Sequence, residues 1–327
     1  MNASLRALLT GAIDYAGMFP PAGLPLGRAI DSYRQYRGSK ASWMLGRLVI
    51  PAAQLADLAA MYDRERDGRL TVVVPGADSS AVLLKNLDQL LTCVGRFPAA
   101  GAIDMLEFRW PVDSVRDSDA SRLVNLVQAA AGQIVASRLP SMTMFFELPR
   151  PEALPVDAAP LEARSREIRA AAAALAEFNQ SARGLNCLAG FKLRCGGTQP
   201  SDVPSSAEVA LAICACRDSG VFWKATAGLH HPLCHTNSEG WAPAHGFLNL
   251  VCAAVLAEIH GLDERCVQTL IEESDQRQFK FSDAALAWRE RAVPTEKIAA
   301  ARERSFRSFG SCSFDEPCDD LDALGLM

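Results

Sequence analysis

The sequence predicts a single (β/α)8 barrel over residues 1–327, with an elaborated insertion at about 262–304 between the seventh and eighth strands. Short β-rich runs alternate with longer stretches of helical periodicity, a pattern typical of parallel α/β architecture. Eight strands with seven or eight intervening helices in a chain of this length fit a closed barrel better than an open doubly wound sheet. The glycine fingerprint G-x-G-x-x-G of a dinucleotide fold does not follow the first strand, which further disfavours the open sheet.

The expected strands are, in chain order, Ala12–Phe19, Trp43–Ile50, Leu70–Val74, Ile103–Trp110, Met142–Leu148, Gly190–Cys195, Val221–Thr226 and Phe306–Phe314. Several of the helices expected between them begin after Ser, Asp or Pro, as helix starts do. They are Leu26–Tyr36, Ala53–Arg64, Ser80–Val94, Ala120–Ser137, Leu161–Gln180, Ser205–Asp218 and His245–His260. The insertion is expected to hold an extra helix, a small hairpin around Phe279–Trp288 and the helix Thr295–Arg304.

Composition excludes some classes of protein. The chain is 49% hydrophobic and 22% charged, as an ordinary globular protein is, and its net charge of −5 argues against a nucleic-acid partner. No run of 18 or more apolar residues predicts a membrane span, and the segment Met1–Pro20 lacks a clean cleavage signal. We therefore expect a cytoplasmic protein with no membrane partner. A homodimer is an open expectation, because barrel enzymes of this size are often dimers.

Ten cysteines are scattered through the chain, mostly in apolar segments, where cysteine behaves as a small buried hydrophobe. The close pair Cys214-Ala-Cys216 lacks the two-residue gap of zinc and redox motifs. We expect reduced structural thiols, with Cys195 and Cys312 set apart because they lie in segments at the predicted barrel rim.

Charged residues gather near the predicted C-terminal ends of strands, where barrel enzymes place their catalytic groups. The first strand ends near Asp14 and Tyr15, Arg47 lies on the second, Glu107 and Arg109 lie on the fourth, and Glu147 lies on the fifth. Side chains two residues apart on a strand share a face, so Glu107 and Arg109 point together. Charged groups are costly to bury in an apolar core, so we expect these side chains to line the mouth of the barrel.

The sixth and seventh strands each carry a lysine, Lys192 and Lys224, and lysine is costly to bury without a partner or a purpose. The same alternation pairs Lys192 with Arg194 on one face and Lys224 with Thr226 on another. Two such lysines, one strand-helix-strand unit apart, predict an active site at the rim of a parallel sheet.

This set of groups suits a lyase of the class I aldolase type acting on a small anionic carbonyl compound without a cofactor. A lysine that is partly desolvated beside other cations is expected to be a neutral amine, which can condense with a carbonyl to form a Schiff base. Glu147 or Glu107 would shuttle protons, and Arg194, Arg109 or Arg47 would hold a carboxylate or phosphate of the substrate.

Both lysine segments resemble parts of a known family. The stretch Lys224-Ala-Thr-Ala-Gly228 resembles the Lys-Thr-Ser-Thr-Gly signature at the Schiff-base strand of the deoxyribose-phosphate aldolase family. Lys192 with Gly196 and Gly197 is similar to that family's second lysine strand, which ends in a glycine pair that helps bind phosphate. The order of the two strands is reversed here. The resemblance implies a lysine-dependent lyase; the motif favours Lys224 as the nucleophile, whereas strand position favours Lys192.

The histidines support a competing hypothesis. Four of the five lie within 16 residues after the seventh strand: His230, His231, His235 and His245. Imidazole is the commonest metal ligand, so His230, His231 and His235 could bind a divalent metal with Glu107, Glu147 or Asp14, as in a metal-dependent lyase or hydrolase. His230 and His231 could instead bind the substrate by hydrogen bonds.

The C-terminal segment Phe309–Pro317 is small and polar between aromatic residues. As an eighth strand it would turn Ser311 and Ser313 toward the site and offer backbone amides to an anion, and a nucleophilic Cys312 is an open alternative. A barrel that binds a small anion without turnover is the third hypothesis.

Overall fold

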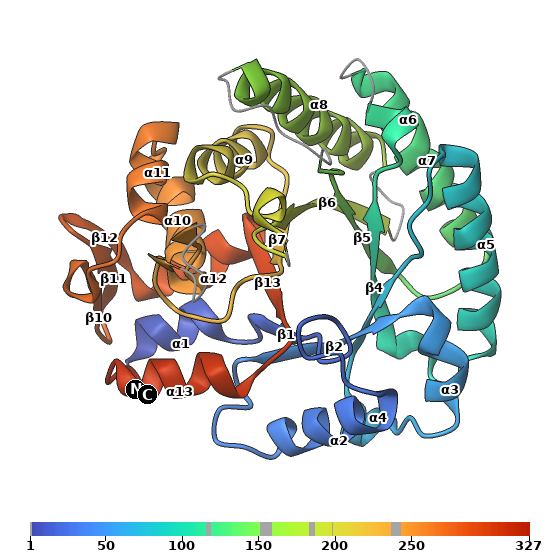
Figure 1. The fold of residues 1–327 in the computed structure, drawn as a ribbon, viewed down its shortest axis with the longest axis horizontal. Coiled ribbons are helices and arrows are strands. Elements are labelled where there is room, and N and C mark those ends of the chain that lie inside the picture. The colour runs from blue at the N-terminus through green and yellow to red at the C-terminus, as the bar shows by residue number, and fades with distance from the viewer. Residues whose placement is uncertain (1, 116–118, 151–158, 183–186, 198, 237–242) are drawn as a thin grey trace.

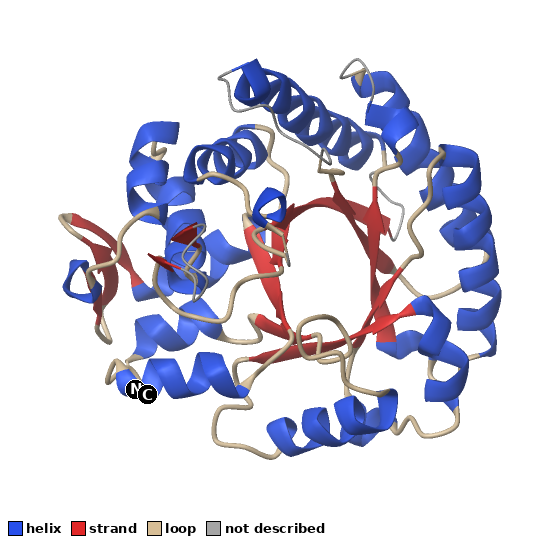
Figure 2. Cartoon of the chain, in the orientation of Figure 1, coloured by secondary structure: helices blue, strands red, loops and turns tan. Residues whose placement is uncertain are grey.

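The computed structural model describes the chain apart from residues 1, 116–118, 151–158, 183–186, 198 and 237–242. Eight parallel strands close into a barrel in the order β1-β13-β7-β6-β5-β4-β3-β2, with helices around the outside (Figures 1 and 2). The barrel strands are β1 (Ile13–Tyr15), β2 (Leu45–Pro51), β3 (Leu70–Val73), β4 (Ile103–Arg109), β5 (Met142–Glu147), β6 (Cys187–Arg194), β7 (Trp223–Thr226) and β13 (Phe306–Ser311). Each lies where the sequence predicts a strand, so the (β/α)8 fold is confirmed.

The helices of the ring follow the predicted periodicity closely. They are α2 (Leu26–Arg37), α5 (Ser80–Arg96), α7 (Ala120–Ala136), α8 (Ala159–Ser181), α9 (Ser206–Asp218) and α10 (Phe247–His260), with the short α6 (Val112–Val115) before α7. Side-chain oxygens cap three of them, since Ser79, Asp119 and Ser205 accept hydrogen bonds from first-turn amides of α5, α7 and α9.

The predicted helix Ala53–Arg64 is wrong as one continuous element. The structure has a 3-10 turn at Ala52–Gln54, then α3 (Leu55–Ala59) and α4 (Arg64–Asp67). The chain leaves the helix after α3 because Asp63 begins a new one: its backbone is extended and its carboxylate accepts hydrogen bonds from the amides of Glu65 and Arg66.

Residues 262–304 hold the extra elements expected of them. They form α11 (Glu264–Ile271), a three-stranded antiparallel sheet of β10 (Phe279–Phe281), β11 (Ala285–Trp288) and β12 (Arg291–Pro294), and α12 (Thr295–Arg304). The expected hairpin is therefore a three-stranded sheet, because β12 adds a strand before α12. A short antiparallel pair, β8 (His235–Thr236) with β9 (Pro243–Ala244), lies in the segment after β7.

Helices α1 (Ala3–Leu9), α6 and α13 (Asp315–Ala323) were not predicted. Helix α1 buries Leu5, Leu8 and Leu9, and α13 follows the last barrel strand. No helix within the described residues is long and apolar enough to cross a bilayer.

The strands separate an apolar outer face from a polar inner one. On β4, Leu106 and Phe108 turn outward into the main core, where Phe108 stacks on Phe146 at 4.7 Å, while Glu107 turns into the barrel. Met105 and Phe145 belong to a separate small cluster with Phe222 inside the barrel. The alternation along each strand thus keeps the apolar helix contacts outside and leaves the interior to charged groups and this small apolar cluster.

Candidate active site

Lys224 lies at the centre of the barrel interior and is fully buried. Its Nζ lies 2.8 Å from Asp14 Oδ2 on β1 and 2.5 Å from Glu107 Oε1 on β4. The same Nζ lies 3.5 Å from Met105 Sδ and 5.7 Å from the centre of the Phe145 ring. Two carboxylates and an aromatic face therefore compensate the buried ammonium group.

Lys192 lies beside it, since Lys192 and Lys224 are directly opposite each other in the register of β6 and β7. Lys192 Nζ lies 2.8 Å from Glu107 Oε2 and 2.9 Å from Glu147 Oε2. Arg194, two residues further along β6, places its Nε 2.7 Å from Glu147 Oε1. The six side chains form one alternating series of acid and base, here named the charged chain: Asp14, Lys224, Glu107, Lys192, Glu147 and Arg194.

Exposure increases along the charged chain from one end to the other. The side chain of Lys224 is 0% exposed, that of Lys192 is 9% exposed, and that of Arg194 is 33% exposed. Arg194 is also the last residue of β6, so this end of the chain faces the C-terminal mouth of the barrel. Of Lys192 and Arg194, Arg194 is therefore the one that lies nearer to solvent at the mouth.

Asp14 is held by groups that the charge pattern does not identify. Its Oδ2 accepts a hydrogen bond from Ser308 Oγ at 2.6 Å, and its Oδ1 accepts one from the backbone amide of Arg47 at 2.8 Å. A Cβ at position 46 would collide with Asp14 Oδ1, so Gly46 makes room for the carboxylate. Together these contacts fix the carboxylate that faces Lys224.

The pKa shifts follow from these contacts. Burial by itself would raise the pKa of Glu107, but the ammonium groups of Lys192 and Lys224 outweigh it and lower that pKa to about 2. Burial would likewise raise the pKa of Glu147, yet Lys192 and Arg194 lower it below its usual value. For Lys192, burial acts to lower the pKa, and the carboxylates of Glu107 and Glu147 outweigh it and raise the pKa above its ordinary value.

The expectation of a neutral amine is therefore wrong for Lys192 in this arrangement. The sequence places cations near one another, but in the barrel each lysine contacts carboxylates. Strand β4 brings Glu107 to both lysines, and β5 brings Glu147 to Lys192. Lys192 is an ammonium ion at neutral pH, and any role as a nucleophile requires that a proton leave it first.

Arg47 is misplaced in the prediction. It is the third residue of β2, near the N-terminal end of the strand, and its guanidinium donates hydrogen bonds to Asp104 at 2.6 and 2.9 Å. Asp104 also contacts Arg69, so this group lies at the end of the barrel opposite the mouth. Arg109 does end β4 at the mouth, where it is exposed and lies opposite Glu147 in the register.

The remaining predicted residues lie at the rim. Thr226 ends β7 in register with Arg194, and Ser311 is buried at the end of β13. Gly196 and Gly228 approach so closely that a Cβ on Gly196 would meet the Gly228 backbone. The close packing of the two loops therefore explains why each segment has a glycine here. A Cβ on Gly197 would meet the carboxylate of Asp202, so an acid already lies beside the expected phosphate position.

The histidines do not converge on the charged chain. His230 Nδ1 lies 2.7 Å from Glu316 Oε2, His231 Nδ1 lies 2.6 Å from Asp320 Oδ2, and His235 Nδ1 lies 2.9 Å from the carbonyl oxygen of Leu233. Within the described residues, no group of three or more His, Cys, Asp or Glu side chains could hold a metal ion. The alternative metal set His230, His231 and His235 is thus not assembled, because α13 supplies separate carboxylates to two of its members.

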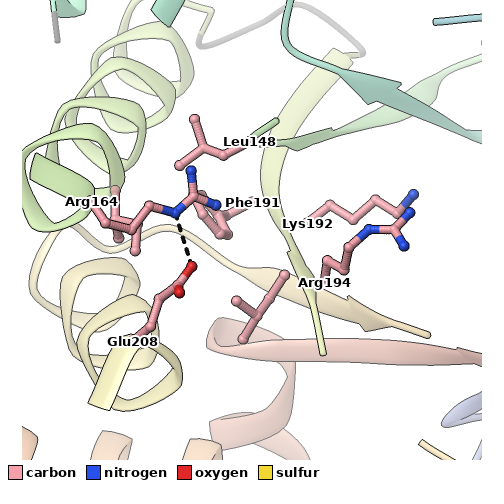
Figure 3. Close-up of a pocket in the computed structure, with 8 residues that line it drawn as sticks. Leu148, Arg164, Phe191, Lys192, Arg194 and Glu208 are labelled. Atoms are coloured by element: carbon pink, nitrogen blue, oxygen red, sulfur yellow. Dashed lines mark hydrogen bonds and ion pairs between the residues drawn. The ribbon is translucent and has the colours of Figure 1, made fainter. Parts of the chain in front are cut away.

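A second polar cluster lies behind β6, on the side away from the charged chain. Arg164 Nε lies 2.9 Å from Glu208 Oε1, and Arg150 Nη1 lies 3.1 Å from the same oxygen. Figure 3 shows Arg164 and Glu208 on one side of the strand, with Lys192 and Arg194 extending to the other. The adjoining cavity of about 10 Å³ has room for about one water molecule, which is too small for a substrate.

Reasoning from the sequence missed Ser308, Gly46 and Met105 as parts of the site. Ser308 lies in the segment expected to form the eighth strand and is two residues before Gly310, which is in register with Asp14. Met105 is two residues before Glu107, so the alternation that turns Glu107 inward also turns Met105 inward. Gly46 has no signal in the sequence that distinguishes it from other strand glycines.

No family model matches the chain, and no curated protein is similar to it. Twenty-one chains of solved structures match, among them one described as "QR15, an Aldolase", with a TM-score of 0.44 and 12% sequence identity over 78% of this chain and 89% of that one.

Proposed function

We propose that the protein is a lysine-dependent lyase of the class I aldolase type that acts on a small anionic carbonyl compound at the mouth of the barrel. The observation that carries this proposal is the pair of lysines opposite each other on β6 and β7, both in contact with Glu107, with Arg194 at the exposed end. Such a site combines an amine, acids that can move protons and a cation that can hold an anionic group.

Lys192 is the proposed nucleophile. It is the lysine nearer to the exposed Arg194, whereas Lys224 is enclosed by Asp14, Glu107 and the Phe145 ring. A carbonyl carbon must reach the amine, so exposure decides between the two. Lys224 then acts by keeping Glu107 ionised and in place.

Deprotonation of Lys192 is the step that the resting contacts oppose. Arg194 helps to lower the pKa of Glu147. An anionic substrate that attracts Arg194 away from Glu147 would raise the pKa of this carboxylate, which could then accept a proton from Lys192. The free amine adds to the carbonyl, and the carbinolamine loses water to give the imine. Substrate binding and nucleophile activation are thereby coupled through one guanidinium group.

Borohydride trapping tests this proposal. The protein is incubated with a panel of small aldehydes and ketones that carry a carboxylate or phosphate, reduced with borohydride, and mapped by peptide mass spectrometry. We expect a secondary amine on Lys192, lost in Lys192→Met. The exposed Lys280 is the internal control for non-specific amine reaction. Labelling of Lys280 to the same extent as Lys192, or no reduction product on Lys192 with any compound, would overturn the imine mechanism.

One observation favours a second candidate, a barrel that binds a small anion without turnover. The raised pKa of Lys192 keeps its ammonium form, which attracts an anion but cannot attack a carbonyl. Isothermal titration with the same compounds separates the two hypotheses, because binding with no trapped adduct and no product supports the second.

A further inference from the structure

A thiol, an imidazole and a carboxylate from separate elements meet at the C-terminal rim of the barrel. Cys312 directly follows β13, His230 lies in the loop after β7, and Glu316 lies in the first turn of α13. Cys312 Sγ lies 3.8 Å from His230 Nε2, and His230 Nδ1 lies 2.7 Å from Glu316 Oε2. Cys312 is partly exposed.

These contacts suit an activated thiol. Glu316 orients the ring of His230 through one nitrogen, and the other nitrogen faces the sulfur and can take its proton. The hydrogen bond with Cys312, helped by Glu316 and opposed by burial, raises the pKa of His230 to about 9. The imidazole therefore carries a proton at neutral pH, and an adjacent imidazolium stabilises a thiolate.

Other charged or titratable groups face this pair from the neighbouring elements. Tyr15 on β1 lies close enough to Cys312 and Asp315 for both to help raise the pKa of its hydroxyl, although burial contributes most. Asp315 begins α13 and accepts a hydrogen bond from Tyr36. The cation in contact with the sulfur is thus His230, with Glu316 at its other ring nitrogen.

We propose that Cys312 is a modification site for low-molecular-weight disulfides, made reactive by His230 and oriented through Glu316. The thiolate attacks one sulfur of the disulfide, a new S–S bond forms to Cys312, and the original S–S bond breaks. The departing thiolate takes the proton that His230 received from Cys312, so one thiol is released for each mixed disulfide formed. This proposal does not depend on imine formation at Lys192.

The other cysteines provide the comparison. Cys216 and Cys252 are buried, and burial raises the pKa of each thiol. On α13 itself, burial raises the pKa of Cys318 to about 12. Cys93 is more exposed than Cys312, but it lies on α5, far in the chain and fold from the histidine loop. If exposure alone decided reactivity, Cys93 would react first.

The wild-type protein tests the proposal without any variant. Glutathione disulfide is added at pH 7, and mixed disulfides are quantified at each cysteine by peptide mass spectrometry. We expect Cys312 to react at least about tenfold faster than Cys93. Equal rates at the two thiols would overturn the proposal.

Three variants then assign the roles. His230→Gln should lower the Cys312 rate to that of Cys93, and Glu316→Gln should lower the rate by a smaller factor. His231→Gln is the matched control, because it removes the neighbouring contact with Asp320 on the same helix and leaves Cys312 untouched. An unchanged rate in His230→Gln, or an equal loss in His231→Gln, would refute the role of His230.

Discussion

Lys192 and Lys224 lie directly opposite each other on neighbouring strands, and both ammonium groups contact the two oxygens of one carboxylate, Glu107. Two cations side by side in a barrel interior would repel each other strongly in the low dielectric there. The shared carboxylate, with Asp14 beyond Lys224 and Glu147 beyond Lys192, makes the arrangement stable. The consequences of this geometry can be measured.

Glu107→Gln should destabilise the fold by about 3–5 kcal/mol, because the buried ammonium groups of Lys192 and Lys224 lose the carboxylate that both of them contact. The measurement is the free energy of unfolding from urea titration at neutral pH. Glu290→Gln, on an exposed turn of the insertion, is the control and should change stability by less than about 0.5 kcal/mol. A similar small effect in both variants would show that the interaction of Glu107 with the lysines contributes no net stability.

Acid should weaken the fold through the same carboxylate. The pKa of Glu107 is about 2 in the folded protein, against an ordinary value near 4.3, so the folded state binds this proton more weakly than the unfolded state does. Its contribution is present above about pH 4.3 and is lost as pH falls toward 2, to a total of about 3 kcal/mol. Unfolding free energies across this window should fall less steeply in Glu107→Gln than in the wild type; parallel curves would contradict the assignment.

Gly46→Ala should move Asp14, because a Cβ at this position collides with its Oδ1 and lies close to the backbone oxygens of Gly11 and Ile13. We expect a loss of about 1–3 kcal/mol in unfolding free energy. Gly27→Ala is the control: it lies in α2 with no atom near the new methyl group, and alanine is the better helix former. The melting temperatures of the two variants should shift in opposite directions. An unchanged melting temperature in Gly46→Ala would show that Asp14 can accommodate the added methyl group.

Arg194→Gln should separate binding from folding. The side chain is partly exposed, so its loss should change the melting temperature little, while the yield of borohydride adduct on Lys192 should fall at least about tenfold because an anionic substrate loses its guanidinium partner. Arg69→Gln removes an exposed arginine at the other end of the barrel and should leave the adduct yield unchanged. Equal yields from wild type and Arg194→Gln would remove Arg194 from substrate binding.

Much of the architecture was predictable from local patterns. Each barrel strand is short and flanked by turn residues or helix caps, and the inward direction of Glu107, Lys192 and Lys224 follows from the period of two along a strand. The second helix was predicted incorrectly because its break depends on the cap at Asp63 rather than on the periodicity. Helix α13 was missed because its sequence is rich in acids, and its partners, His230 and His231, lie on a distant loop.

The sequence by itself determined that Glu107, Lys192 and Lys224 face the barrel interior and that the two lysines are neighbours there, because both follow from strand order and alternation. Only the tertiary structure decided which charges meet. In the folded barrel Glu107 lies between the two lysines, and Arg47 contacts Asp104 at the opposite end. Glu316 of α13 contacts His230 of the loop after β7. The protonation of each group depends on its contacts at a few ångströms, so the reversal from an expected neutral amine to an ion-paired Lys192 could come only from the folded arrangement.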